Sequence, residues 1–256
     1  MHPVLFKLGS ITIYTYGFLI AVGCIVAFIY MWRASKMTFD QANTLFILLI
    51  IAGIVGGKLF LVFEDIGYIK NPQRLLSGGG FVFYGSLLFC IPTMLLFFRK
   101  NKLPILSMLD VMAIVTCIVH CFGRLGCFMA GCCYGVPTDG FPGVIFTDPV
   151  CQAKPLNTPL HPTQLYEATF IFLLLVGLLV LKRRKTFDGQ VFLVYLIVYA
   201  TGRGIIELFR GDIERGFVIK DILSNSQFIS LVMVLVAVWF YVKLRRKANL
   251  VAQRTR

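Results

Sequence analysis

The chain has 256 residues, a length that by itself allows one or two soluble domains. Its composition excludes that class, because 58% of the residues are apolar, 14% are charged and the mean hydropathy is +0.82. Apolar runs near 20 residues have the length that an α-helix needs to cross a hydrocarbon core of about 30 Å. The sequence therefore predicts an all-α polytopic membrane protein.

Seven such runs follow one another, and we expect each to be a transmembrane helix. They cover residues 11–32, 42–63, 81–98, 103–125, 162–181, 191–209 and 227–244. Because they use more than half of the chain, we expect residues 1–256 to form a single integral-membrane domain, with an outer loop at about 134–160. The first run is too long, and its flanks are too polar, for a cleavable signal peptide.

The net charge of +13 could indicate a nucleic-acid partner, but the positions of the basic residues argue against one. Fifteen of the 25 Lys and Arg residues lie in alternate loops, on one side of a seven-span arrangement: Arg33, Lys36, Arg99, Lys100, Lys102, Lys182, Arg183, Arg184, Lys185, Lys243, Arg245, Arg246, Lys247, Arg254 and Arg256. The positive-inside rule places that side in the cytoplasm, with the N-terminus outside and the C-terminus inside. We interpret the charge as a topology signal and a contact with anionic lipids.

Topology does not require the basic residues near the outer ends of the spans, among them Arg124, Arg203 and Arg210. A charge at membrane depth is costly and indicates a functional site. Arg124 follows about twenty apolar-rich residues and opens a stretch rich in glycine and cysteine that runs to Gly135, so we expect a tight turn directly after it. In the second span, closely spaced glycines such as Gly56 predict close helix packing.

Two helical patterns surround these arginines. His120 lies four residues before Arg124 and shares its helix face, where the neighbouring charge favours the neutral imidazole that a general base requires. A packing or capping histidine is the alternative. Tyr199, Arg203 and Glu207 recur at intervals of four, which aligns a phenol, a guanidinium and a carboxylate on one stripe. A purely structural ion pair is the alternative reading of that stripe.

Further polar groups gather at the same ends of the spans. Tyr16 and Tyr84 stand at span starts, where an interfacial aromatic belt is the alternative to a pocket role. The glycines at 78–80 precede the third span and offer backbone N–H groups to an anion. His161, Gln164 and Glu167 share one face at the start of the fifth span.

Five of the eight cysteines lie at or after the end of the fourth span: Cys121, Cys127, Cys132, Cys133 and Cys151. They do not form two matching C-x-x-C pairs, and adjacent cysteines rarely bind one tetrahedral ion. We therefore expect no metal site. Close-packed thiols are our main interpretation, and a disulfide at the outer face is the alternative.

Several segments together resemble the prolipoprotein diacylglyceryl transferase family: residues 1–6, 13–17, the glycine-rich entry to the third span, 123–128, 161–167, and Tyr199 with Arg203, Glu207 and Arg210. They run in family order from residue 1 to about 210. The resemblance implies transfer of the diacylglyceryl group of phosphatidylglycerol to the lipobox cysteine of a prolipoprotein, with glycerol phosphate as the leaving group. It also implies a bacterial inner-membrane enzyme that acts at the outer face without a cofactor.

The resemblance also implies roles for individual residues. Arg124 and Arg203 are the critical pair, and two guanidiniums in a dry pocket suit an anionic phosphate. The implied substrate-binding residues are Tyr16, Gly123, Gly126, Cys127, Tyr199, Glu207, His161, Gln164 and Arg210. Family members carry a histidine and two glycines where this chain has Tyr84-Gly85-Ser86, so the base that activates the thiol stays open among Tyr84, His120 and the substrate phosphate.

Two other functions remain open on the sequence. A transporter or lipid-binding membrane protein with an arginine-lined cavity would also explain charges within the spans. A family paralogue that keeps the phospholipid pocket but has changed its acceptor is the second.

Overall fold

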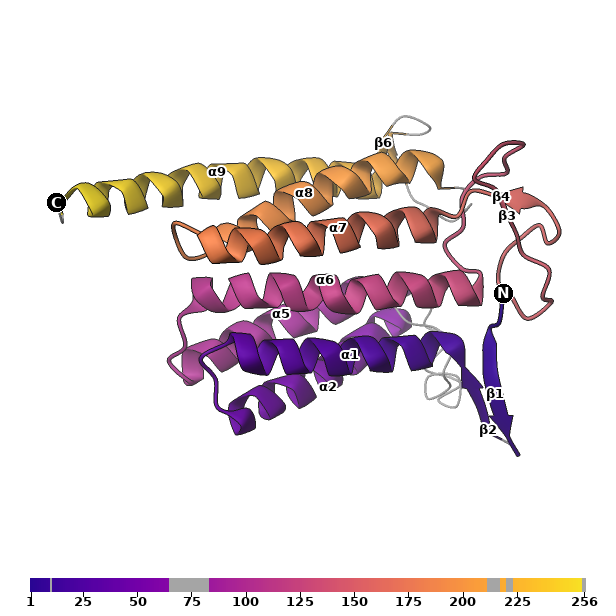
Figure 1. Cartoon of the computed structure of the whole chain (residues 1–256), viewed down its shortest axis with the longest axis horizontal. Coiled ribbons are helices and arrows are strands. Elements are labelled where there is room, and N and C mark those ends of the chain that lie inside the picture. Colours follow the sequence, from indigo (N-terminus) through magenta and orange to yellow (C-terminus); the bar gives the residue numbers. More distant parts are fainter. Residues whose placement is uncertain (10, 65–82, 211–216, 220–222, 255–256) are drawn as a thin grey trace. The chain divides into compact units, whose positions relative to one another are not determined.

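The computed structural model describes residues 1–9, 11–64, 83–210, 217–219 and 223–254. These residues contain seven α-helices and three two-stranded antiparallel sheets (Figure 1). Six of the helices are long and apolar enough to cross a membrane. The predicted helical class is therefore confirmed, and the short strands add to it.

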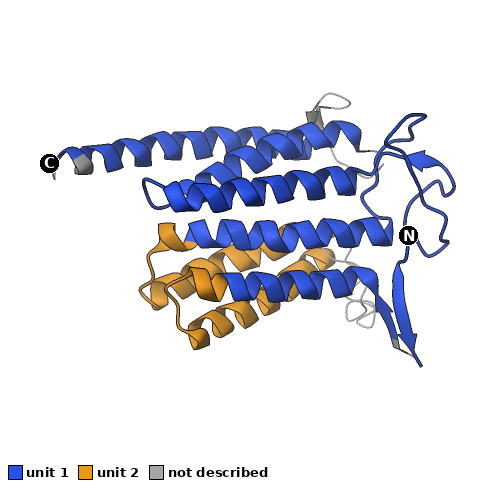
Figure 2. Cartoon of the chain, viewed as in Figure 1, with its two compact units in different colours: residues 1–30, 109–256 blue, residues 31–108 orange. Residues whose placement is uncertain are grey.

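The described residues form two compact units (Figure 2): residues 1–30 with 109–256, and residues 31–108. The second unit contains α2 (Phe39–Glu64) and α5 (Phe83–Lys100). The first contains most of α1 (Thr15–Ala34) and of α6 (Ile105–Ala130), together with α7 (Thr163–Arg184), α8 (Gln190–Ile206), the 3-10 turn η1 (Glu207–Phe209) and α9 (Asn225–Arg254). A small hairpin of β5 (Phe217–Ile219) and β6 (Leu223–Ser224) precedes α9.

The chain enters α1 later than predicted, because the first residues of the expected span form a strand. β2 (Ile11–Tyr14) pairs antiparallel with β1 (Val4–Leu8). Isoleucine, threonine and tyrosine all favour extended backbone, which explains the strand. The amide of Thr15 then donates to the Pro3 carbonyl at 3.0 Å and its hydroxyl donates to the His2 carbonyl, so the hairpin is tied to the first turn of α1.

The expectation of a turn directly after Arg124 is wrong, since α6 continues to Ala130. Gly126 is not a turn residue. A Cβ at Gly126 would lie 2.9 Å from the Tyr16 ring and 3.3 Å from the Tyr16 Cα, so this glycine lets α6 approach α1 closely. The turn begins at Gly131, whose φ of +73° suits a residue without a side chain.

In the second unit, α2 and α5 pack backbone against backbone. A Cβ on Gly56 would overlap the carbonyl of Gly85, and one on Gly85 would overlap the carbonyl of Gly56. The Ser86 hydroxyl donates to the Gly53 carbonyl at 2.8 Å beside this contact. The packing role predicted for the glycines of the second span is thereby confirmed at Gly56.

The core of the first unit fills the space between α6, α7 and their neighbours. Its buried residues are Ala27, Ile114, Cys117, Ile118, Ile171, Leu174, Leu178 and Val191. A second small core lies beneath the loop that joins α6 to α7, where β3 (Val144–Ile145) pairs with β4 (Pro159–Leu160) around the fully buried Phe146 and Leu160. The loop predicted at about 134–160 is therefore an ordered segment with its own core.

A buried carboxylate fixes the start of α8. Asp110 on α6 is fully buried and accepts hydrogen bonds from the amides of Gly189, at 3.0 Å, and Phe192, at 2.9 Å. These amides belong to the first turn of α8, which has no partners of its own for them. Lys185 lies 3.1 Å from the same carboxylate. Burial lowers the Lys185 pKa, but its hydrogen bonds to Asp188 and Asp110 outweigh that effect, so the pKa is raised above 10.5.

Candidate functional site

The polar site lies where the ends of α6 and α8 meet the start of α7. These three helices alternate in direction within the first unit, which brings those ends together (Figure 1). The same ends carry His120, Arg124, Tyr199 and Arg203, which the sequence analysis predicts as site residues. The last turns of α7 and the C-terminal part of α9 carry clusters of basic residues.

Glu167 on α7 is the centre of the site. Its Oε1 atom lies 3.1 Å from Nη2 of Arg124 and 3.3 Å from Nε2 of His120, both on α6. It also accepts a hydrogen bond from the hydroxyl of Tyr199 on α8, at 3.4 Å. The Glu167 side chain is only 3% exposed, so three groups from two other helices compensate a carboxylate that water barely reaches. One acidic residue thus joins the three helices at this end.

The position of the proton on His120 decides which of its two contacts is a hydrogen bond. Nε of Arg124 lies 3.2 Å from Nε2 of His120 and can donate only if that nitrogen is bare. The contact between Nε2 and Glu167 is a hydrogen bond only if Nε2 carries a proton. The two bonds therefore exclude one another, and the imidazole has two alternative tautomers with different partners. The predicted pairing of His120 with Arg124 on one helix face is confirmed by this contact.

Arg203 continues the site along α8. Its Nη1 lies 2.6 Å from Oε2 of Glu207, and both side chains are largely buried. The ring of Tyr199, one turn before Arg203, packs edge-on against His120, with 5.3 Å between ring centroids. Tyr199, Arg203 and Glu207 thus follow one stripe, as their spacing predicts.

Helix α1 borders the site through two glycines of α6. Gly126 faces Tyr16 as described above, and a Cβ on Gly123 would lie 3.4 Å from the side chain of Ile20. The Tyr16 side chain is 43% exposed, so its ring covers α6 without being enclosed by the chain. The two glycines therefore bring α1 close to the helix that carries Arg124.

His161 and Arg210 belong to the backbone frame around the site. Nδ1 of His161 lies 2.9 Å from the Tyr166 hydroxyl, and the His161 carbonyl accepts from the amide of Gly135 at 2.8 Å. Gly135 forms an isolated bridge with Arg210, and a Cβ at Gly135 would collide with His161. These contacts tie the start of α7 to the end of η1. The substrate-binding roles implied for His161 and Arg210 remain predictions.

The turn after α6 closes with a Schellman motif. The amide of Cys132 donates to the Cys127 carbonyl at 3.1 Å, and the amide of Gly131 donates to the Phe128 carbonyl at 3.3 Å. Cys133 follows with a positive φ of 59°. The motif folds Cys132 back toward Cys127 and leaves Cys133 beside both.

The thiols of Cys127, Cys132 and Cys133 consequently form one cluster, with all three sulfur atoms within 4.8 Å of one another. All eight cysteines of the chain are free. Hydrogen bonds from the thiols of Cys127 and Cys132, together with the charges of Arg124 and Arg210, lower the pKa of Cys133. Cys127 therefore lies in a thiol cluster at the edge of the site.

Gln164 holds this turn against α7. Its Nε2 donates to the Cys132 carbonyl at 2.7 Å, while the hydroxyl of Thr163 donates to the Cys133 carbonyl at 2.6 Å. The side chain of Gln164 is fully buried, and its Oε1 accepts no hydrogen bond from any described residue. Gln164 thus fixes the backbone of the turn, and its predicted contact with substrate remains a prediction.

Two further predictions concern residues outside the first unit. Tyr84 is on α5 in the second unit, where its side chain is 58% exposed, and its assignment as a base remains a prediction. The glycines at 78–80 lie outside the described residues.

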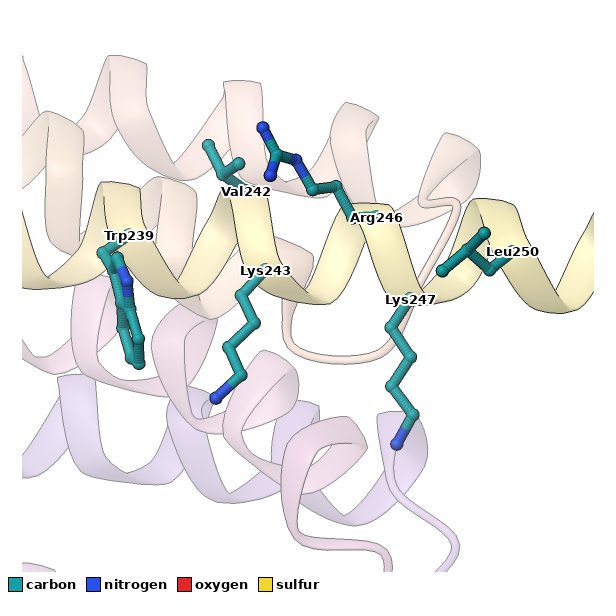
Figure 3. Close-up of a pocket in the computed structure, with 6 residues that line it drawn as sticks. All are labelled: Trp239, Val242, Lys243, Arg246, Lys247 and Leu250. Atoms are coloured by element: carbon teal, nitrogen blue, oxygen red, sulfur yellow. The ribbon is translucent and has the colours of Figure 1, made fainter.

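A shallow hollow of about 400 Å³ lies near the C-terminal end of α9 (Figure 3). All six residues that line it belong to α9, so it is a groove on the surface of one helix: Trp239, Val242, Lys243, Arg246, Lys247 and Leu250. Nζ of Lys243 lies 4.7 Å from the centroid of the Trp239 ring. Tryptophan and lysine together are typical of a helix at the membrane interface.

Glu167 is the residue that the sequence analysis noted but did not assign to the site. An acidic residue five positions after the start of a predicted span is itself a signal, because burying a carboxylate in a bilayer requires a compensating partner. Its partners come from other helices, however, so the sequence did not show which charges it joins.

The helices and the buried charge cluster define a multi-pass membrane protein with a polar site at one end of the bundle. Residues 3–243 match the family model described as prolipoprotein diacylglyceryl transferase. The chain belongs to the prolipoprotein diacylglyceryl transferase family, and it is therefore a transferase. The predicted family resemblance is confirmed.

Relatives from several bacteria match almost the whole chain. A phosphatidylglycerol–prolipoprotein diacylglyceryl transferase of Clostridium tetani is 42% identical over 246 residues, which cover 94% of this chain and 97% of the relative. A second such transferase of Clostridium perfringens is 34% identical, covering 94% of each chain. The transferase of Rhizobium meliloti is 31% identical, covering 97% of this chain and 94% of its own.

Proposed function

We propose that the chain transfers the diacylglyceryl group of phosphatidylglycerol to the lipobox cysteine of prolipoproteins, the first step of lipoprotein maturation. The observation that carries the proposal is a pair of largely buried arginines in the first unit: Arg124 on α6 lies 3.1 Å from Glu167, and Arg203 on α8 lies 2.6 Å from Glu207. The names of the relatives supply the substrates. The partners are thus phosphatidylglycerol and the signal-peptide region of a prolipoprotein, within a membrane.

The reaction forms a bond between the cysteine sulfur and a glycerol carbon, and breaks the bond from that carbon to a phosphate oxygen. Glycerol phosphate leaves with the electron pair, and the thiol loses its proton. Negative charge therefore grows on the phosphate as the bond breaks. Arg124 and Arg203 offer guanidinium donors to that charge in a largely buried site, where such interactions are strongest.

His120 can accept the thiol proton in only one of its two tautomers. When Nε2–H donates to Glu167, the bare Nδ1 is available as a base, and the carboxylate stabilises the imidazolium that forms. When Nε2 instead accepts from Arg124, Nδ1 carries the proton and cannot act. Tyr84 and the substrate phosphate stay as the other candidate bases.

We propose that the enzyme lies in the bacterial cytoplasmic membrane with its site toward the outer face, and the charge pattern supports this orientation. Within the first unit, the basic residues that end α7 and α9 lie at the end away from Glu167 (Figure 1). By the positive-inside rule that end is cytoplasmic. In a seven-span arrangement the N-terminus is then outside and the C-terminus inside.

The test is diacylglyceryl transfer from phosphatidylglycerol vesicles to a lipobox peptide, with complementation of a transferase-depleted bacterium. Arg124→Ala and Arg203→Ala are expected to abolish transfer while the protein still inserts into the membrane. Arg184→Ala removes an exposed arginine from the opposite end of α7 and is the matched control, with activity near wild type. If the wild type fails to modify the peptide, the proposed reaction is refuted.

The same assay tests a changed acceptor. A wild type that consumes phosphatidylglycerol only with another thiol or hydroxyl acceptor would identify a paralogue that keeps the phospholipid pocket. Release of glycerol phosphate without modification of the lipobox peptide distinguishes such a paralogue from the proposed prolipoprotein transferase.

A further inference from the structure

We infer that Cys127, Cys132 and Cys133 form a binding site for one thiophilic metal ion, zinc(II) or copper(I), at the end of α6. The three sulfur atoms lie within 4.8 Å of one another. This inference revises the expectation of no metal, which rested on the absence of matching C-x-x-C pairs. It depends on the geometry of the turn and not on the proposed reaction.

The distances suit a single ion. A zinc–sulfur bond of about 2.3 Å places two sulfur ligands about 3.8 Å apart in tetrahedral geometry and about 4.0 Å apart in a trigonal plane. The cluster needs to contract by less than about 1 Å to reach these values. Rotation of three cysteine side chains about their Cα–Cβ bonds supplies movements of that size without a change in the backbone.

The backbone that presents the sulfurs is already fixed. In a Schellman motif the residue after the left-handed glycine packs against the residue five positions before it, which here are Cys132 and Cys127. The left-handed φ of Cys133 turns the next side chain into the same cluster. Buried Gln164 and Thr163 hold the carbonyls of Cys132 and Cys133, so the site is largely preformed and an ion would not have to order the turn.

Two nearby arginines can offset the charge of the cluster when an ion is bound. Three thiolates with zinc(II) carry a net charge of −1, and with copper(I) a net charge of −2. Arg124 and Arg210 are both close enough to act electrostatically on Cys133. They offset that negative charge in a partly buried place where it would otherwise be costly.

The ligand set limits which ions fit. Soft thiolates select zinc(II) and copper(I) over magnesium, calcium or manganese, which prefer oxygen. Copper(I) accepts three thiolates in a plane, while zinc(II) with three protein ligands takes a water as its fourth. Each cysteine loses its proton to solvent when the ion binds, so binding weakens as the pH falls.

The experiment measures metal bound to the full chain, purified in detergent under reducing conditions and dialysed against zinc(II) alone or copper(I) alone. We expect about one ion per chain from at least one of the two, and at least a tenfold loss of affinity in Cys127→Ser, Cys132→Ser and Cys133→Ser. Cys24→Ser, a thiol on α1 away from the cluster, is the matched control and is expected to keep the wild-type stoichiometry. Cobalt(II) substitution should give a thiolate-to-metal charge-transfer band that the three cluster variants lose.

Two results would overturn the inference. One is binding that stays below about a tenth of an ion per chain with both metals, or that is the same in the cluster variants as in Cys24→Ser. The other is a mass lower by two hydrogens, mapped to a disulfide within the cluster after purification under reducing conditions. Neither result bears on diacylglyceryl transfer, which the peptide assay measures separately.

Discussion

Replacement of Glu167 tests whether a carboxylate positions the arginine of the site. In Glu167→Ala, Arg124 keeps its charge but loses the partner that lies 3.1 Å from its Nη2, and both side chains are largely buried. Removing one partner of a buried ion pair costs about 3–5 kcal/mol of stability. Losing a correctly placed donor to a developing negative charge lowers kcat by about 10²–10³.

The expected signature is a fall in kcat of about 10²–10³ with little increase in the KM for phosphatidylglycerol, since the positive charge that attracts phosphate stays in the site. Steady-state transfer to a lipobox peptide measures both constants, and thermal unfolding in detergent measures the stability loss. Glu167→Gln retains the shape and one acceptor oxygen, so we expect an intermediate kcat.

Asp188→Ala is the matched control. Asp188 is also a carboxylate in an ion pair, with Lys185 at 2.6 Å, but it is 54% exposed and lies at the opposite end of the first unit. Its loss should change kcat by less than twofold. A folded Glu167→Ala enzyme whose kcat stays within tenfold of wild type would refute the positioning role.

Three further changes test the packing and the second buried charge. Asp110→Ala should lower the free energy of unfolding by about 3–5 kcal/mol, which thermal unfolding measures. The change leaves the amides at the start of α8 and the Lys185 ammonium without their carboxylate partner. The pKa of Lys185 is raised in the folded protein, so its ion pair stabilises the fold fully below the unfolded pKa of about 10.4. This stabilisation is lost as the pH rises through the folded pKa. The difference in stability between wild type and Lys185→Met should therefore vanish at pH values above the folded pKa. Gly126→Val should destabilise by about 1–3 kcal/mol and reduce transfer, because its side chain collides with Tyr16, whereas Gly177→Ala on α7, where a Cβ meets nothing within 4 Å, should be neutral or slightly stabilising.

The helices were predictable because each corresponds to a long apolar run, which can be recognised without knowing the neighbouring helices. The ends of the helices were harder to predict. The run at residues 11–14 is as apolar as the helix after it, and its strand-favouring residues together with its pairing to β1 make it a strand. In the sequence, Gly126 looks like a turn glycine because it stands among other glycines. Its role in helix packing is visible only in the structure, where Tyr16 lies against it.

The site was predictable where its contacts are local. His120 and Arg124 are one turn apart, as are Arg203 and Glu207, and helical spacing alone brings each pair together. Glu167 was not predicted to belong to the site, because its partners Arg124 and Tyr199 are 43 and 32 residues away in the chain. The spacing of residues in a sequence does not show which helices are neighbours.

The thiol cluster shows the same limit at shorter range. The interval from Cys127 to Cys132 matches no common metal-binding spacing, and it brings the sulfurs together only because Gly131 ends the helix in the left-handed conformation. A glycine at that position is a recognised helix-end signal. Read together with the two cysteines, it would have predicted their contact.

The arrangement around Glu167 also bears on how an anionic substrate enters. In the chain alone, the charge of Arg124 is balanced by Glu167, and the charge of Arg203 by Glu207. A phosphate that binds both guanidiniums must therefore share them with two buried carboxylates, which repel it. Each guanidinium has five N–H donors in a planar fork, so one edge can hold the carboxylate while another holds the phosphate. Lysine has a single ammonium, which cannot hold the carboxylate and the phosphate on two separate edges. Arg124→Lys keeps the charge, but we expect it to be nearly as inactive as Arg124→Ala. Near-wild-type transfer by Arg124→Lys would show that charge alone, and not the fork, is what the site requires.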